Sequence, residues 1–168
     1  RMPRCVNGGE RSTMPTIQEN IDIRAPIDKV FAALIDPRRG PEWNPNLVRV
    51  EDVEAGPARA GTEWRQTTMV AGRPINLNCR VTKLDAPKFG VLEVTGDHQG
   101  SVTTMCEERD GMTRVTQTLQ YNLPRGMFGQ MAGGFIANAL RREMVRTMDR
   151  QRTILERENA SSDRSPDT

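Results

Sequence analysis

The feature that most limits the possible folds is a run of predicted strands with no helix between them. Alternating apolar and polar residues, separated by turn residues, predict six strands at 47–54, 62–70, 74–86, 89–95, 102–109 and 113–123. The dipeptide Asp110-Gly111 is typical of a two-residue hairpin turn. Parallel strands need crossover connections of a dozen or more residues, so strands this closely spaced predict an antiparallel sheet.

A further strand and three helical segments flank this run. Residues 16–24 alternate as a strand does, Pro26 suits the first turn of a helix that ends before Pro37, and residues 38–46 predict a short second helix or turn. Residues 126–158 predict a long amphipathic helix. Its apolar stripe consists of Phe128, Met131, Phe135, Ala139 or Leu140, Met144, Met148 and Leu155. We therefore predict an α+β fold, with a curved seven-stranded antiparallel sheet wrapped around a long C-terminal helix and two short helices between the first two strands.

The chain of 168 residues is long enough for one domain, which we place at residues 14–158. Residues 1–13 have no hydrophobic period, and Gly8-Gly9-Glu10 would be encoded by a purine-rich run of the ribosome-binding kind just before Met14. We expect residues 1–13 to be a disordered leader and Met14 to be the native start, which the intact mass of protein from the native gene would test. The polar segment 159–168 predicts a disordered tail.

Charge and cysteine content exclude several classes of protein. The net charge is +2 and no stretch is apolar for 18 residues, so we expect neither nucleic-acid binding nor stable membrane insertion. The three cysteines, Cys5, Cys79 and Cys106, form no CxxC pair and predict reduced thiols in a bacterial-type cytoplasm. The single histidine, His98, lies in a polar turn, so we expect no metal site. We also expect no cofactor, and a monomer or weak homodimer.

Polar residues interrupt the faces of two predicted strands that should be buried. Period two places Gln66 and Thr68 on the same face as Trp64, and it places Gln117 and Tyr121 on one face of the last strand. An unpaired amide in a dry core costs about 1–3 kcal/mol. Either the strand register is shifted so that these side chains face water, or the core is partly hollow.

The order of these elements resembles a known family over residues 16–155. The motifs that carry the resemblance are Ala25-Pro26, Val30-Phe31, Leu34, Asp36-Pro37, Trp43, Gly61, Val81 with Leu84, Ala86-Pro87 and the run Gly111–Val115. They are similar to those of the START-like (SRPBCC) superfamily, the polyketide cyclase/dehydrase and lipid-transport group with the helix-grip fold. The resemblance is specific for the fold and unspecific for function.

The resemblance implies a pocket between the concave face of the sheet and the long helix. The candidate ligand-binding residues are Trp43, Trp64, Gln66, Thr68, Leu77, Gln117, Leu119, Tyr121, Phe128, Met131 and Phe135. We expect a soluble carrier or sensor of a small hydrophobic molecule such as a lipid, an isoprenoid or an aromatic polyketide, with the polar members of this set orienting the ligand.

Two other functions remain open at this point. The same pocket could serve a polyketide cyclase or dehydratase, with Tyr121 and Arg80 as the first candidates for proton transfer, although alternation predicts that Arg80 faces outward. Alternatively the pocket is vestigial, and the Arg-rich outer face of the long helix, including Arg146 and Arg150, contacts a partner protein.

Overall fold

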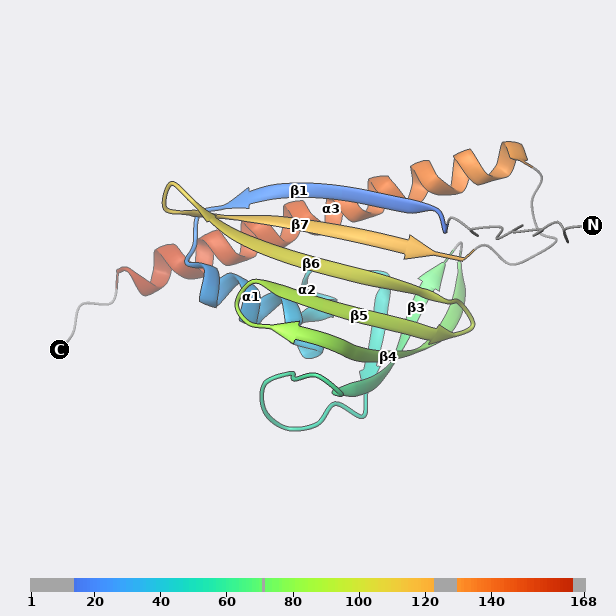
Figure 1. The fold of residues 1–168 in the computed structure, drawn as a ribbon, viewed down its shortest axis with the longest axis horizontal. Helices are drawn as coiled ribbons and strands as arrows, with labels where there is room; N and C mark the ends of the chain where they lie inside the picture. The colour runs from blue at the N-terminus through green and yellow to red at the C-terminus, as the bar shows by residue number, and fades with distance from the viewer. Residues whose placement is uncertain (1–13, 71, 123–129, 165–168) are drawn as a thin grey trace, which may run out of the picture.

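The computed structural model describes residues 14–70, 72–122 and 130–164, and the side chains of all of these except residues 130–133. Seven strands form one antiparallel sheet in the order β1-β7-β6-β5-β4-β3-β2 (Figure 1). The strands are β1 (Thr16–Ile23), β2 (Leu47–Glu51), β3 (Glu63–Val70), β4 (Arg73–Asp85), β5 (Phe89–Gly96), β6 (Gly100–Arg109) and β7 (Met112–Tyr121). Two short helices, α1 (Ile27–Ile35) and α2 (Gly40–Trp43), flank the 3₁₀ turn η1 (Pro37–Arg39), and α3 (Gln130–Ser162) is the long helix.

This architecture confirms the predicted helix-grip fold, and the ends of β2 and α3 differ from the prediction by three residues or more. Strand β2 ends at Glu51 rather than at residue 54, because Asp52 adopts the left-handed backbone conformation, with a φ of 61°. Helix α3 continues to Ser162, so the first residues of the predicted disordered tail are helical. The amide of Asn159 donates to the Arg24 carbonyl at 3.4 Å and so ties this last part of α3 to the turn after β1.

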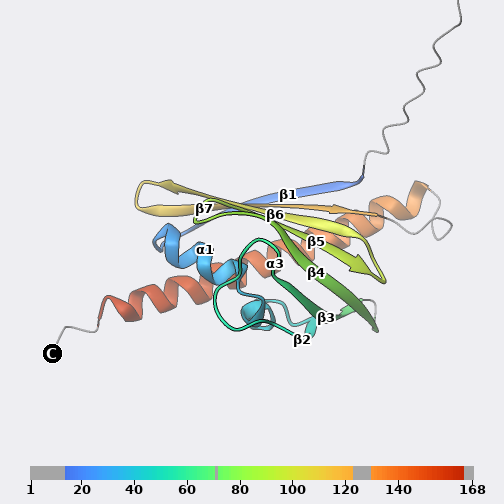
Figure 2. The same cartoon turned by 60° about the horizontal axis from the view of Figure 1, so that its bottom comes forward.

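The helices lie together on one face of the sheet (Figure 2). Helix α3 crosses the sheet obliquely and packs mainly against β1 and α2. Near the start of α3, Arg141 Nη1 lies 2.6 Å from Glu19 Oε1 on β1. The arginines on the outer side of α3, including Arg146 and Arg150, are exposed as predicted. The concave side of the sheet therefore faces α1, α2 and the second half of α3.

The hydrophobic core consists of two clusters rather than one. The first joins α1, α2, α3 and the strands at the β1 side, and its buried members are Ile23, Ala25, Val30, Phe31, Ala33, Trp43, Cys106, Val115, Met148 and Leu155. The second joins β3 and β4 through Trp64, Leu77, Cys79 and Val81. Leu84 is half-buried and packs against both clusters. Whether the core is hollow depends on the space that is left between the two clusters beside Leu84.

Cys79 and Cys106 are free, buried thiols on the concave side of the sheet. Desolvation by burial raises the pKa of Cys79 to about 12, and it raises the pKa of Cys106 to about 12 as well. Only the thiolate is nucleophilic, and at pH 8 it would make up roughly one part in ten thousand of each thiol.

These two thiols should therefore resist alkylation in the folded protein. Because Cys5 lies outside the described residues, the measurement uses the Cys5→Ser variant. We expect no reaction with iodoacetamide at pH 8 under native conditions and two modified thiols per chain in denaturant, both counted by intact mass. Fast modification of either thiol in the native protein would contradict the packing described here.

Candidate functional site

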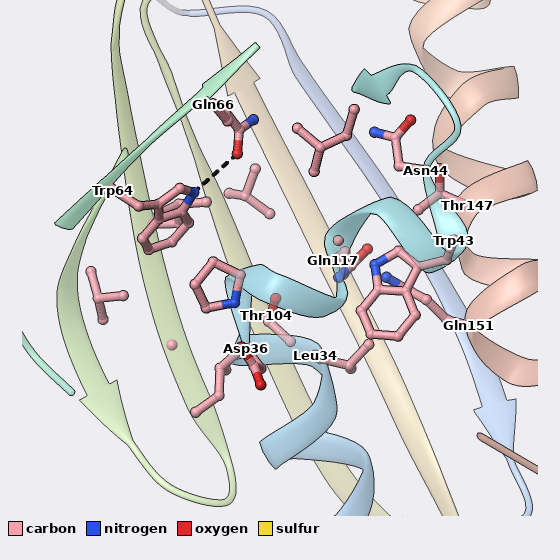
Figure 3. A pocket seen from close by; sticks show the side chains of 18 of the residues that line it. Leu34, Asp36, Trp43, Asn44, Trp64, Gln66, Thr104, Gln117, Thr147 and Gln151 are labelled. Atoms are coloured by element: carbon pink, nitrogen blue, oxygen red, sulfur yellow. Dashed lines mark hydrogen bonds between the residues drawn. The ribbon is translucent and has the colours of Figure 1, made fainter. Parts of the chain in front are cut away.

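A cavity of about 240 Å³ separates the two core clusters (Figure 3). The sheet forms its floor, and the end of α1, the turn η1, α2 and two residues of α3 form its opposite wall. The residues that line it are Leu34, Ile35, Asp36, Pro37, Gly40, Trp43, Asn44, Leu47, Trp64, Gln66, Val81, Leu84, Gly90, Val91, Leu92, Val102, Thr104, Gln117, Thr147 and Gln151. The concave side of the sheet is therefore hollow at the place where a single core would otherwise close.

The turn between α1 and α2 places Trp43 on the cavity wall. The Asp36 carboxylate caps η1 by accepting from the Arg38 backbone N–H at 3.0 Å, and Pro37 follows at the first position of the turn. This sharp change of direction returns the chain over the sheet, so that the short α2 carries Trp43 inward, where only 4% of its surface is exposed.

Arg39 holds the Trp43 ring in place. Its guanidinium lies 5.2 Å from the centroid of a Trp43 ring, a cation–π contact, and Nη2 lies 2.7 Å from Glu42 and 2.6 Å from Glu158 of α3. The hydrogen bond to Glu42, assisted by Glu158, raises the pKa of Arg39 above its usual range. Arg39 is thus a charged link between α2 and α3 on the outer side of the indole.

The position of Gln66 explains why a polar side chain lies on the otherwise apolar face of β3. The Trp64 indole N–H donates a hydrogen bond of 3.1 Å to Gln66 Oε1, and both side chains face the cavity from β3 (Figure 3). Because an indole nitrogen is a donor only, the atom that it meets must be the amide oxygen of Gln66. The Gln66 NH₂ group is therefore the part of this side chain that can donate to a molecule in the cavity.

A second amide, Gln151, enters the cavity from α3. Only 4% of this residue is exposed, and its Oε1 is buried with no hydrogen-bond partner among the described residues. Figure 3 shows its side chain reaching past the Trp43 ring towards Gln117. On the floor, Thr104 of β6 and Gln117 of β7 are direct cross-strand neighbours. The cavity wall is thus mostly apolar with a few polar groups.

The structure places four of the predicted site residues around this cavity: Trp43, Trp64, Gln66 and Gln117. Leu77 is buried in the second core cluster and does not line it. Thr68, Leu119 and Tyr121 also lie on the concave side but beyond the cavity, towards the far ends of β3 and β7. The Thr68 Oγ1 is buried there without a hydrogen-bond partner among the described residues.

The structure leaves Phe135 outside the cavity lining, with 73% of this residue exposed. The oblique course of α3 carries its first turns towards the β1 edge of the sheet, whereas Met148 and Leu155, further along, are buried. The predicted Phe128, and the side chain of Met131, lie outside the described part of the chain. Among the described members of the predicted apolar stripe, Met148 and Leu155 are therefore buried and Phe135 is not.

Sequence reasoning missed five polar residues of the cavity wall: Asp36, Asn44, Thr104, Thr147 and Gln151. Gln151 had a signal like that of Gln66, because it lies at helical spacing between Met148 and Leu155 on the apolar stripe. Thr104 had the same kind of signal, because it alternates with Val102 and Cys106 on the predicted strand at 102–109.

The cavity holds little charge. None of the described residues that line it is Lys, Arg or His, and its single carboxylate, Asp36, accepts a hydrogen bond of 2.8 Å from Arg38 Nε. Arg80 faces outward as predicted and lies 3.5 Å from Glu63, with 62% of its side chain exposed. The described residues contain no cluster of three or more side chains suited to a metal ion, and no helix among them is long and apolar enough to cross a membrane.

Comparison with known proteins adds to this geometry. Residues 14–156 match the sequence profile of a family described as polyketide cyclase/dehydrase and lipid transport. No curated protein sequence matches the chain at a significant level.

Solved structures show the same fold at low sequence identity. The protein TTHA0849 of Thermus thermophilus is 18% identical, with a TM-score of 0.73 over 90% of this chain and 100% of that one. The Zhui aromatase/cyclase of Streptomyces sp. R1128 is 18% identical, with a TM-score of 0.73 over 86% and 94% of the two chains. The protein BH1534 of Bacillus halodurans is 20% identical, with a TM-score of 0.64 over 85% and 98%. These similarities show the fold alone.

Proposed function

The chain belongs to the polyketide cyclase/dehydrase and lipid-transport family, and from this membership we propose that it binds a small, uncharged and mostly apolar molecule in the cavity between the sheet and α3. The observation that carries the proposal is the division of the core, in which two hydrophobic clusters joined through Leu84 leave a cavity between Trp43 and Trp64. Burial of apolar ligand surface contributes about 25 cal/mol per Å².

The size of the cavity favours a compact ligand over a long chain. A volume of 240 Å³ corresponds to about eight water molecules at their liquid volume of about 30 Å³ each. Pockets for drug-sized ligands measure roughly 300–1,000 Å³. Of the ligand classes expected from the family, a fused-ring molecule of the aromatic kind therefore fits better than a long acyl lipid.

The two tryptophans provide a direct test, because the chain has only these two and both line the cavity. We expect naphthalene, an uncharged two-ring molecule, to quench their fluorescence saturably with one site per chain. Hexadecanol should displace it poorly, because a sixteen-carbon chain exceeds the cavity. Native mass spectrometry of gently purified protein should also show a bound small molecule. No saturable quenching, together with no co-purified molecule, would contradict the proposal.

A cyclase is the second candidate, favoured by the likeness of the fold to that of an aromatase/cyclase. The arrangement of titratable groups supports binding instead. Neither Tyr121 nor Arg80 lines the cavity, and its one acidic side chain, Asp36, is engaged with Arg38. The family does not distinguish the two functions.

We also propose a cytoplasmic location, which the free thiols of Cys79 and Cys106 support. A chain of this kind would then meet its ligand inside the cell, in a compartment where buried cysteines stay reduced.

A further inference from the structure

Two amide side chains give the cavity a directional hydrogen-bonding pattern. Resting on the proposed function, we propose that the ligand is an uncharged ring compound with a hydroxyl group that donates to Gln151 and a carbonyl-type oxygen that accepts from Gln66. The cavity would then distinguish ligands by the placement of a donor and an acceptor, and not by shape alone.

The first step concerns Gln66, whose orientation is fixed by its neighbour. Its Oε1 accepts the indole N–H of Trp64 at 3.1 Å, and the indole cannot accept in return. Rotating the amide would bring the NH₂ group against another donor. Gln66 is half-buried and therefore presents N–H groups to whatever fills the cavity, where a ligand oxygen can accept from them.

The second step concerns Gln151, which has the opposite need. Its Oε1 is buried with no hydrogen-bond partner among the described residues, and only 4% of the residue is exposed. Most buried polar groups in folded proteins are hydrogen-bonded, so an unpaired one in a cavity wall points to a partner that enters the cavity. An amide oxygen requires a donor, such as a hydroxyl group.

The third step is the separation of the two groups. Gln66 projects from β3 and Gln151 from α3, and Figure 3 shows them on opposite sides of the cavity. A single ligand that satisfies both must carry its acceptor and its donor at opposite ends. The apolar residues between them, with both tryptophans, match the ring system that would join the two ends.

The fourth step is charge. No described lining residue is a cation, and Asp36 adds a negative charge at one side. A carboxylate ligand would lose its hydration without gaining a counter-charge, which is costly in a largely apolar cavity. The site should therefore discriminate against the anion of an otherwise similar molecule.

The test uses five naphthalene compounds of similar shape, titrated by quenching of tryptophan fluorescence. They are naphthalene, 2-naphthol, 2-acetylnaphthalene, 6-acetyl-2-naphthol and 2-naphthoate. We expect 2-naphthol and 2-acetylnaphthalene each to bind about tenfold more tightly than naphthalene, since a well-placed hydrogen bond contributes about this factor. The compound with both groups should bind most tightly, and 2-naphthoate should bind more weakly than naphthalene.

Two variants assign the two preferences to their residues. Gln151→Met keeps the length and volume of the side chain and removes the acceptor, so the advantage of 2-naphthol over naphthalene should disappear. Gln66→Glu keeps an acceptor for Trp64 and removes the donor, so the advantage of the acetyl group should disappear at pH 8. Each variant should retain the preference that belongs to the other residue, which makes each a control for the other.

The outcomes separate this inference from the proposed function. If none of the five compounds binds, the proposed function fails. If all bind alike, the cavity function stands and the hydrogen-bonding pattern is overturned, as it would be if a fixed water molecule already satisfied Gln151. Persistence of the hydroxyl preference in Gln151→Met would likewise overturn it. A folding defect is detected separately, because Gln151→Met should leave the melting temperature unchanged or raise it.

Discussion

Replacing Thr104 by phenylalanine should reduce ligand binding by at least about 100-fold, or about 2.7 kcal/mol, while leaving the protein folded. Thr104 lies on the cavity floor in β6, directly opposite Gly90 of β5 and Gln117 of β7. Because Thr104 faces the cavity, the new ring would extend into it and occupy the volume that we assign to the ligand. Titration of naphthalene measures the loss of binding.

The control is Thr104→Val, which removes the hydroxyl group and keeps nearly the same volume. We expect it to bind naphthalene as the wild-type protein does. The free energy of unfolding of Thr104→Phe should stay within about 1–2 kcal/mol of wild type, since a cavity is being filled rather than a packed core being forced apart. Undiminished binding in Thr104→Phe would place the ligand somewhere other than this cavity.

Replacing Phe31 by alanine should cost about 3–5 kcal/mol of the free energy of unfolding. Phe31 is 1% exposed in the first core cluster, and a Cβ built on Gly90 would lie 3.7 Å from its Cζ. The ring thus packs from α1 onto the backbone of β5 at Gly90, beside Leu84 and Ile35. Urea denaturation followed by circular dichroism measures the loss.

A matched control comes from Phe135, the same residue type in a helix but 73% exposed. We expect Phe135→Ala to change the free energy of unfolding by no more than about 0.5 kcal/mol. Equal losses in the two variants would mean that the first turns of α3 are packed in solution, contrary to the structure.

The contrast between Phe31 and Phe135 shows where sequence reasoning succeeds and where it stops. Both lie in amphipathic patterns, and periodicity assigns both to a buried face. Periodicity describes a helix relative to its own axis and contains no information on how far a neighbouring sheet extends. Phe31 lies where α1 meets the sheet, whereas Phe135 lies on a part of α3 where its side chain is left exposed.

The strands were easier to predict because their signals are local. Alternation and turn residues such as Asp110-Gly111 specify each strand and its hairpin within a few residues, and close spacing then requires an antiparallel order. Gln66 and Gln117 were found because a polar residue stands out on an apolar face. Thr68 and Tyr121 share those faces but lie past the cavity, since a face pattern gives no position along the strand.

The helix side of the cavity could be predicted least. Asn44 and Thr147 take part only because the capped turn at Asp36 and the oblique course of α3 bring them there. Arg39 contributes through a guanidinium that joins Glu42 and Glu158, residues more than 100 positions apart in the chain. Such long-range arrangements depend on the whole tertiary structure.

Because the core is divided into two clusters, a bound ligand would form part of the hydrophobic interior. Without a guest, the lobe of β3 and β4 is joined to the rest of the hydrophobic interior chiefly through Leu84 and through the backbone ladder. A ligand that contacts Trp43 on one side and Trp64 on the other would connect the two core clusters, so that both unfold in one cooperative transition. Ligand binding would then make the whole domain more rigid. The free energy of unfolding would increase with the logarithm of the ligand concentration.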